Sequence, residues 1–198
     1  MELRPFRAVH REPPYKERRP ALWIDRQVFS HSDGNTTVVP LLIGLVRVAE
    51  KEIVLGSDGA AADAVARRVG ALVSVKADAE PCLLVTRAPI EAALTTSRPP
   101  DEVMTDAAGV RHDLFRMPEY ARHVELQGLV KNAEAELAGG HELWEAARTF
   151  SVSPAAAKLP GAKFKLCAIL DERSVGEPRK LPEALAGVLG FAFEDAVY

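Results

Sequence analysis

The stretch from residue 135 to residue 147 reads AELAGGHELWEAA, and it decides the class of the fold. The first four residues predict a short strand, the two glycines predict a turn, and good helix formers continue to about Phe150. A helix that begins directly after a glycine turn presents unpaired N–H groups and a partial positive charge. His141 lies at that position, so the turn is a candidate site for an anion.

On either side of this unit, strand-like and helix-like segments alternate without a repeating βαβ order. Turns at 32–35 and 107–109 predict two hairpins. This order predicts an α+β fold with a mixed, largely antiparallel sheet, hairpins and flanking helices. Residues 1–20 predict an extended, basic, proline-rich arm, and residues 21–198 predict a single domain. The expected strands are 21–29, 36–48 (with Pro40 at an edge or bulge), 53–55, 82–87, 103–106, 110–117, 135–138 and 164–170, and the expected helices are 60–72, 89–94, one opening at Pro118, 141–150 and 182–189.

Composition restricts the class of protein. The chain has 198 residues, of which 47% are hydrophobic, and a formal net charge of −3, which argues against a nucleic-acid binder that acts through bulk charge. No apolar run reaches the roughly 18 residues of a membrane span. Cys82 and Cys167 lie in separate apolar runs, which predicts buried free thiols, and a cytoplasmic, soluble protein follows as an expectation.

Familiar catalytic motifs are missing from the sequence. It contains no GxxxxGK[ST] phosphate loop, no GxGxxG turn, no HExxH and no GxSxG. The other four histidines predict structural or surface roles, whereas His141 has Glu145 one helical turn away, an arrangement that suits general acid–base catalysis. The competing interpretation is that His141 merely begins the helix and the glycines merely allow a tight turn.

Short motifs in the same order along the chain resemble the family catalogued as domain of unknown function 1015. That family has a Lys/Arg-Pro-Phe-Arg start, a Pro-Pro-Tyr, two paired strands with Tyr-Arg-Gln and Gly-Leu-Ile/Val-Arg, a Gly-Val-Arg-His hairpin and a signature Ala-Asp-Gly-His-His-Arg. The corresponding residues here are Arg4-Pro5-Phe6-Arg7, Pro13-Pro14-Tyr15, Asp25-Arg26-Gln27, Gly44-Leu45-Val46-Arg47, Gly109-Val110-Arg111-His112 and Ala138-Gly139-Gly140-His141-Glu142-Leu143.

The resemblance implies a ParB/sulfiredoxin-like signature loop, in which a Gly-His-Arg turn at a helix start holds nucleotide phosphate. It further implies an activity similar to that of free-serine kinases, which transfer phosphate from ATP with Mg²⁺. This chain departs from the pattern. The family's acidic residue is Gly139, its second histidine is Glu142 and its phosphate-gripping arginine is Leu143.

Three functions are therefore expected in decreasing order. The first is a catalytically impaired relative that binds a small ligand or a protein partner. The second is an ATP-dependent kinase of a small hydroxyl metabolite such as free serine, with Arg111 or Arg148 as relocated cations. The third is a ParB-like nucleic-acid module using the basic arm. The candidate residues are His141 and Glu145 for catalysis and Gly139, Gly140, Arg111 and Arg26 for ligand binding; no metal site is expected, and ATP with Mg²⁺ would be a cofactor only in the kinase alternative.

Overall fold

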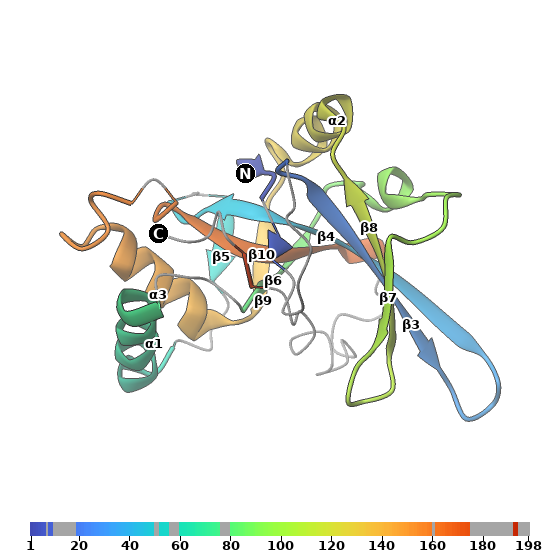
Figure 1. Cartoon of the computed structure of the whole chain (residues 1–198), viewed down its shortest axis with the longest axis horizontal. Helices are drawn as coiled ribbons and strands as arrows, with labels where there is room; N and C mark the ends of the chain where they lie inside the picture. Colours follow the sequence, from blue (N-terminus) through green and yellow to red (C-terminus); the bar gives the residue numbers. More distant parts are fainter. Residues whose placement is uncertain are drawn as a thin grey trace.

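A computed structural model describes residues 1–6, 8–9, 19–49, 52–55, 60–75, 80–159, 161–174 and 192–193. These residues form an α+β fold built on one large open sheet with helices at its sides (Figure 1). The strands of that sheet are β1 (Leu3–Arg4), β3 (Leu22–Ser30), β4 (Thr36–Arg47), β5 (Ile53–Leu55), β6 (Cys82–Thr86), β7 (Glu102–Thr105), β8 (Arg111–Met117), β9 (Ala135–Gly139) and β10 (Phe164–Asp171).

The order of the strands across the sheet is β5-β9-β6-β10-β4-β3-β8-β7, and β1 pairs with β4 beside this path. Only β5 with β9 and β6 with β10 run parallel, so most neighbours are antiparallel. A separate two-stranded sheet joins β2 (Ala8–Val9) to β11 (Ala192–Phe193). The predicted fold class, a mixed and largely antiparallel sheet with hairpins and flanking helices, is confirmed.

Two glycine turns form the hairpins. Gly34 and Gly109 both adopt φ of +83°, a backbone conformation that side chains with a Cβ rarely adopt. Gly34 closes the long β3–β4 hairpin, which extends away from the helices in Figure 1, and Gly109 closes β7–β8. Pro40 pairs with Arg26 on one side of β4, and the ladder with β10 begins only at Leu42, so the proline lies at a local edge as predicted.

In the part of the chain that the structure describes, three α-helices and two short 3₁₀ helices flank the sheet. Figure 1 shows α1 and α3 lying side by side at one end of the sheet, with α2 near the other. Helix α3 contacts β6 and β10, and α2 contacts β1. The bounds are α1 (Ala62–Val75), α2 (Tyr120–Val130), α3 (His141–Ser151), η1 (Glu91–Leu94) and η2 (Glu172–Ser174).

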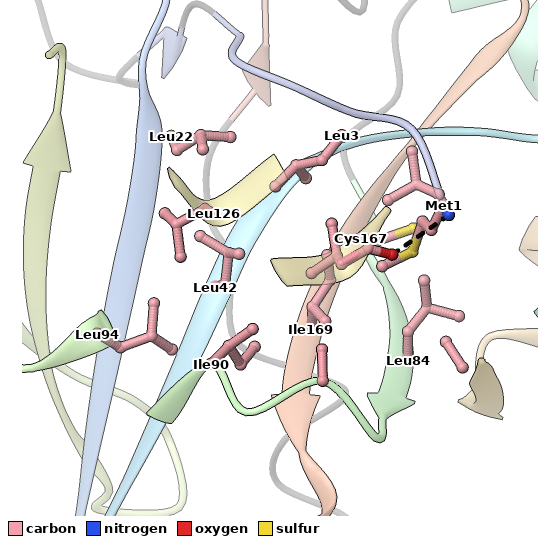
Figure 2. Packing of buried hydrophobic residues seen from close by; sticks show 14 of the residues in the cluster. Met1, Leu3, Leu22, Leu42, Leu84, Ile90, Leu94, Leu126, Cys167 and Ile169 are labelled. Atoms are coloured by element: carbon pink, nitrogen blue, oxygen red, sulfur yellow. Dashed lines mark hydrogen bonds between the residues drawn. The ribbon is translucent and has the colours of Figure 1, made fainter. Parts of the chain in front are cut away.

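The largest apolar cluster lies between one face of the sheet and the segments that cover it. Leu42, Leu84 and Ile169 come from neighbouring strands, and Leu126 of α2 and Trp144 of α3 pack against the same cluster. Figure 2 shows these strand residues together with Leu126, and beside them Met1 and Cys167. The ammonium group of Met1 donates hydrogen bonds to the carbonyl oxygens of Val130 and Lys131 at 3.3 and 2.7 Å.

The N-terminal residues differ from the expected arm. Leu3 and Arg4 pair with Val46 and Leu45 of β4, and Phe6 forms a bridge with Ala21. Residues 1–6 therefore belong to the sheet, because burial of Met1, Leu3 and Phe6 outweighs the local basic and proline-rich character. Residues 7 and 10–18, and the helix expected at 182–189, lie outside the described residues.

Candidate functional site

The glycine turn before α3 has the geometry that the sequence predicts. Gly140 is the N-cap residue with φ of +82° and ψ of 30°, and its carbonyl oxygen accepts the first helical hydrogen bond, from the Trp144 N–H, at 2.9 Å. The same carbonyl accepts a hydrogen bond from the Cys82 thiol at 3.3 Å. A Cβ at position 140 would lie 3.1 Å from Cys82 Sγ and 3.2 Å from Cys82 Cα. Two independent constraints therefore require glycine at this position.

Gly139 is under weaker constraint than Gly140. It pairs with Leu83 of β6 next to a register shift in the β6–β9 ladder. A Cβ on Gly139 would meet Leu83 Cβ at 3.7 Å, which is ordinary van der Waals contact. The second glycine alone determines the path of the chain into α3.

Substitution of Gly140 by alanine should lower the free energy of unfolding by about 1–3 kcal/mol, because it combines a left-handed backbone with a close contact to the Cys82 main chain. Gly139→Ala is the matched control and should leave stability unchanged or raise it by up to about 1 kcal/mol. Urea denaturation of the two variants measures both effects. Equal losses from the two substitutions would show that the packing of Cys82 against the turn has been assigned wrongly.

Glu145 pairs with Arg148 in this structure rather than with His141. The Nε2 atom of His141 is buried, and no residue within the described ranges gives it a hydrogen-bond partner. Glu145 Oε1 instead accepts a hydrogen bond from Arg148 Nη1 at 2.9 Å. The carboxylate that was expected to act beside the histidine thus forms an ion pair with an arginine on its own helix.

Arg26 and Arg111 lie together, but away from the turn. Asp113 of β8 holds both of them: Arg26 Nη2 donates to its Oδ2 at 2.7 Å and Arg111 Nε donates to its Oδ1 at 2.8 Å. Burial acts to raise the pKa of Asp113, but the hydrogen bonds and charges of the two arginines outweigh burial and hold that pKa below its ordinary value. These arginines stabilise a buried carboxylate.

The sheet separates this ion pair from the glycine turn. Strand β9 carries Gly139, strand β3 carries Arg26, and β6, β10 and β4 lie between them. At about 4.8 Å for each step between neighbouring strands, the two sites are about 19 Å apart across the sheet. One small ligand therefore cannot contact both, and the predicted site divides into two.

A second polar cluster, which the sequence did not single out, lies on the opposite face of β3 and β8. His112 Nδ1 lies 3.0 Å from Asp25 Oδ1 and 3.1 Å from Oδ2, and Gln27 Nε2 donates to Asp25 Oδ2 at 3.0 Å. His112 Nε2 faces Asp106 Oδ2 at 3.7 Å. Burial acts to lower the pKa of His112, but the hydrogen bond and charge of Asp25, aided by Asp106, raise it above its ordinary value. Both members of the Asp25–His112 pair are almost fully buried, so the pair joins two strands inside the protein.

Asp171, at the end of β10, is another buried carboxylate that sequence reasoning missed. Its Oδ2 accepts the Glu91 N–H at the start of η1, at 3.1 Å, and its two oxygens accept the Arg173 guanidinium at 2.9 and 2.6 Å. Burial acts to raise the pKa of Asp171, and these hydrogen bonds lower it below its ordinary value. The contact fixes η1 against the sheet.

The signal for the Asp25 cluster was present in the sequence. Asp25 and Gln27 are two positions apart in a strand, so their side chains share a face, and a polar pair on the same face as the buried Trp23 needs a partner. The pairing of β3 with β8 then places His112 opposite Gln27. Identifying that partner required the pairing of β3 with β8, which are far apart in sequence.

Comparison of the chain with protein-family models, with curated proteins and with solved structures finds no match. Of the helices within the described ranges, none has the length and hydropathy that a membrane-spanning helix needs. The described residues also contain no group of three or more histidine, cysteine, aspartate or glutamate side chains placed to hold a metal ion.

Proposed function

We propose that this protein is a catalytically impaired binding protein, related to the domain of unknown function 1015 family, that recognises a small ligand or a protein partner. The proposal rests on one observation: the residues expected to act in catalysis and phosphate binding lie apart from one another and pair with other side chains. Glu145 is paired with Arg148, and Arg26 and Arg111 are paired with Asp113 across the sheet from the glycine turn. Phosphoryl transfer depends on positioned cations around the phosphates, so this arrangement does not favour turnover.

We propose that this binding protein acts in the cytoplasm. Cys82 and Cys167 are both buried, and they lie opposite each other in register on the neighbouring strands β6 and β10. Two cysteines in separate apolar runs, without the cysteine density of a disulfide-rich secreted domain, suit a reducing compartment. A nucleic-acid partner is not part of the proposal, given the net charge of −3.

Incubation of the full chain with MgATP and a panel of amino acids, serine first, should yield no ADP or phosphorylated product above the rate of a protein-free control. Phosphorus NMR measures both products directly. Turnover that His141→Ala abolishes and that the exposed His31→Ala leaves unchanged would contradict the proposal. It would establish the kinase alternative instead.

One observation favours that alternative, the ATP-dependent kinase of a small hydroxyl metabolite. The buried Nε2 atom of His141 has no hydrogen-bond partner among the residues that the structure covers, and it lies in the first turn of α3, where a phosphate would be stabilised. MgATP at 100 times its dissociation constant would then stabilise the fold by about 2.7 kcal/mol. We expect no change in the melting temperature with millimolar MgATP; a rise that His141→Ala removes would support the kinase.

A further inference from the structure

A cavity of about 260 Å³ lies between β8, the loop after η1 and the start of α2, away from the glycine turn. Ile24, Phe115 and Met117 project from one face of β3 and β8 and lie beneath the cavity, and all three are buried. Polar side chains from the loop and from α2 form its rim. Those side chains are Thr95, Thr96, Arg98, Glu119 and Arg122.

Arg98 is anchored at the rim by its surroundings. Its guanidinium carbon lies 5.7 Å from the centroid of the Phe115 ring, its Nη2 donates to the Arg116 carbonyl oxygen, and its Nη1 lies 2.8 Å from Asp101 Oδ2. A guanidinium has five N–H donors, so these contacts leave further donors available to a ligand. The side chain is thereby held in one place at little additional cost in entropy on binding.

Arg122 of α2 also lines the cavity and is held in a similar way. Its Nη2 donates to the carbonyl oxygen of Ala93 in η1, and its Nη1 lies 2.5 Å from Glu125 Oε2. Asp171 in turn fixes the first residue of η1, so the position of η1 is set by the sheet. Two anchored guanidinium groups therefore border one apolar cavity.

Arg116 contributes its main chain to the cavity. Successive side chains of a strand point to opposite faces, so Arg116 points away from Phe115 and Met117, and its Nη2 donates to the carbonyl oxygen of Arg19 at 2.6 Å. The cationic character of the cavity therefore comes from Arg98 and Arg122 alone among its lining residues.

Three carboxylates limit the charge that a ligand can carry. Glu119 lines the cavity, and Asp101 and Glu125 pair with the two arginines. A dianion such as a phosphate monoester would meet these carboxylates as well as the guanidinium groups, whereas a monoanion would be repelled less. A planar carboxylate also matches the fork of a guanidinium.

We propose that this cavity binds a small organic monocarboxylate, with the carboxylate on Arg98 and Arg122 and the organic group in the rest of the cavity. This proposal rests on the proposed function only in that the protein binds a small ligand. It adds where that ligand binds and to which chemical class the ligand belongs. It requires neither ATP nor the glycine turn.

Titration of the full chain with 4-fluorobenzoate, followed by fluorine NMR line broadening, tests the inference. We expect saturable binding of 4-fluorobenzoate, and at least tenfold weaker binding of 4-fluorobenzyl alcohol and of 4-fluorophenyl phosphate. Equal binding of the alcohol would overturn the role of the arginines. Tighter binding of the phosphate would overturn the monocarboxylate class, and no saturable binding of any probe would overturn the site.

Variants locate the binding. Arg98→Gln and Arg122→Gln should each weaken 4-fluorobenzoate binding by about tenfold, since each removes a charged hydrogen-bond donor. Arg148→Gln is the matched control, because Arg148 is similarly exposed, forms a comparable ion pair three residues away and lies on α3. Thr95→Trp, at an exposed rim position, should block the cavity without altering the core.

Equal affinity in Arg98→Gln, Arg148→Gln and Thr95→Trp would overturn the assignment to this cavity. The result is separable from the test of the proposed function. Loss of probe binding leaves the absence of ATP turnover untouched, and ATP turnover leaves probe binding at the cavity untouched.

Discussion

Asp25→Ala should lower the free energy of unfolding by about 3–5 kcal/mol at pH 6, because it leaves His112 buried without the carboxylate that it faces. Gln27 loses the acceptor of its hydrogen bond in the same variant. Urea denaturation measures the loss. Glu136→Ala is the control, because Glu136 is an exposed carboxylate on strand β9, and it should change stability by less than about 0.5 kcal/mol.

The stability lost in Asp25→Ala should be larger at low pH than at high pH. The pKa of His112 is raised in the folded protein, so the folded state holds this proton more tightly than the unfolded chain does. The resulting stabilisation is fully present below the ordinary histidine pKa of about 6.5 and disappears as the pH rises through the raised folded value. The difference between wild type and Asp25→Ala should therefore be larger at pH 6 than at pH 9.

A double-mutant cycle measures the interaction free energy between Asp25 and His112 apart from their contacts with other residues. The Asp25→Ala/His112→Ala variant should lose less stability than the sum of the two single variants, since neither group is then left buried without its partner. Strict additivity, together with a loss that is the same at both pH values, would contradict the assignment of a coupled pair.

Trp144→Ala should lower the free energy of unfolding by about 3–5 kcal/mol, the usual range for removing a large buried aromatic side chain. Trp144 is 2% exposed and joins α3 to the largest apolar cluster, where it packs with residues of the sheet. Thr149→Ala is the control on the same helix, because Thr149 is exposed and alanine is the better helix former. Thermal or urea denaturation of the two variants gives the comparison.

Thr149→Ala should leave the free energy of unfolding unchanged or raise it slightly. Trp144→Phe should lose less than Trp144→Ala, because it retains most of the buried apolar surface. A loss in Trp144→Ala no larger than that in Thr149→Ala would show that α3 does not pack on the sheet as described.

The local elements could be predicted from the sequence because each depends on neighbouring residues. The β3–β4 hairpin follows from β-branched residues around a turn that contains Gly34, and α3 follows from helix formers after Gly140. The burial of Cys82 and Cys167 follows from the apolar residues on either side of them. In each case the determining contacts lie within about ten residues.

The pairing of strands that lie far apart in the sequence could not be predicted, and the site depended on it. Nothing in the local pattern places β6 and β10 side by side or puts three strands between Arg26 and the glycine turn. The residues of the turn were identified correctly, with Gly140 needed for its backbone. The arginines that were expected to complete it belong to an ion pair with Asp113, because a buried carboxylate between two cations is a more local arrangement than a site spanning the sheet.

Strand β10 has a consequence for the order in which the protein folds. All eight of its residues are buried, and it is inserted between β4 and β6, although it is the last long strand among the described residues. During synthesis β4 and β6 each keep one unpaired edge until β10 has been made. Folding therefore depends on contacts between distant parts of the chain. Refolding should accordingly be slow for a chain of this size, and its intermediates should be prone to edge-to-edge association.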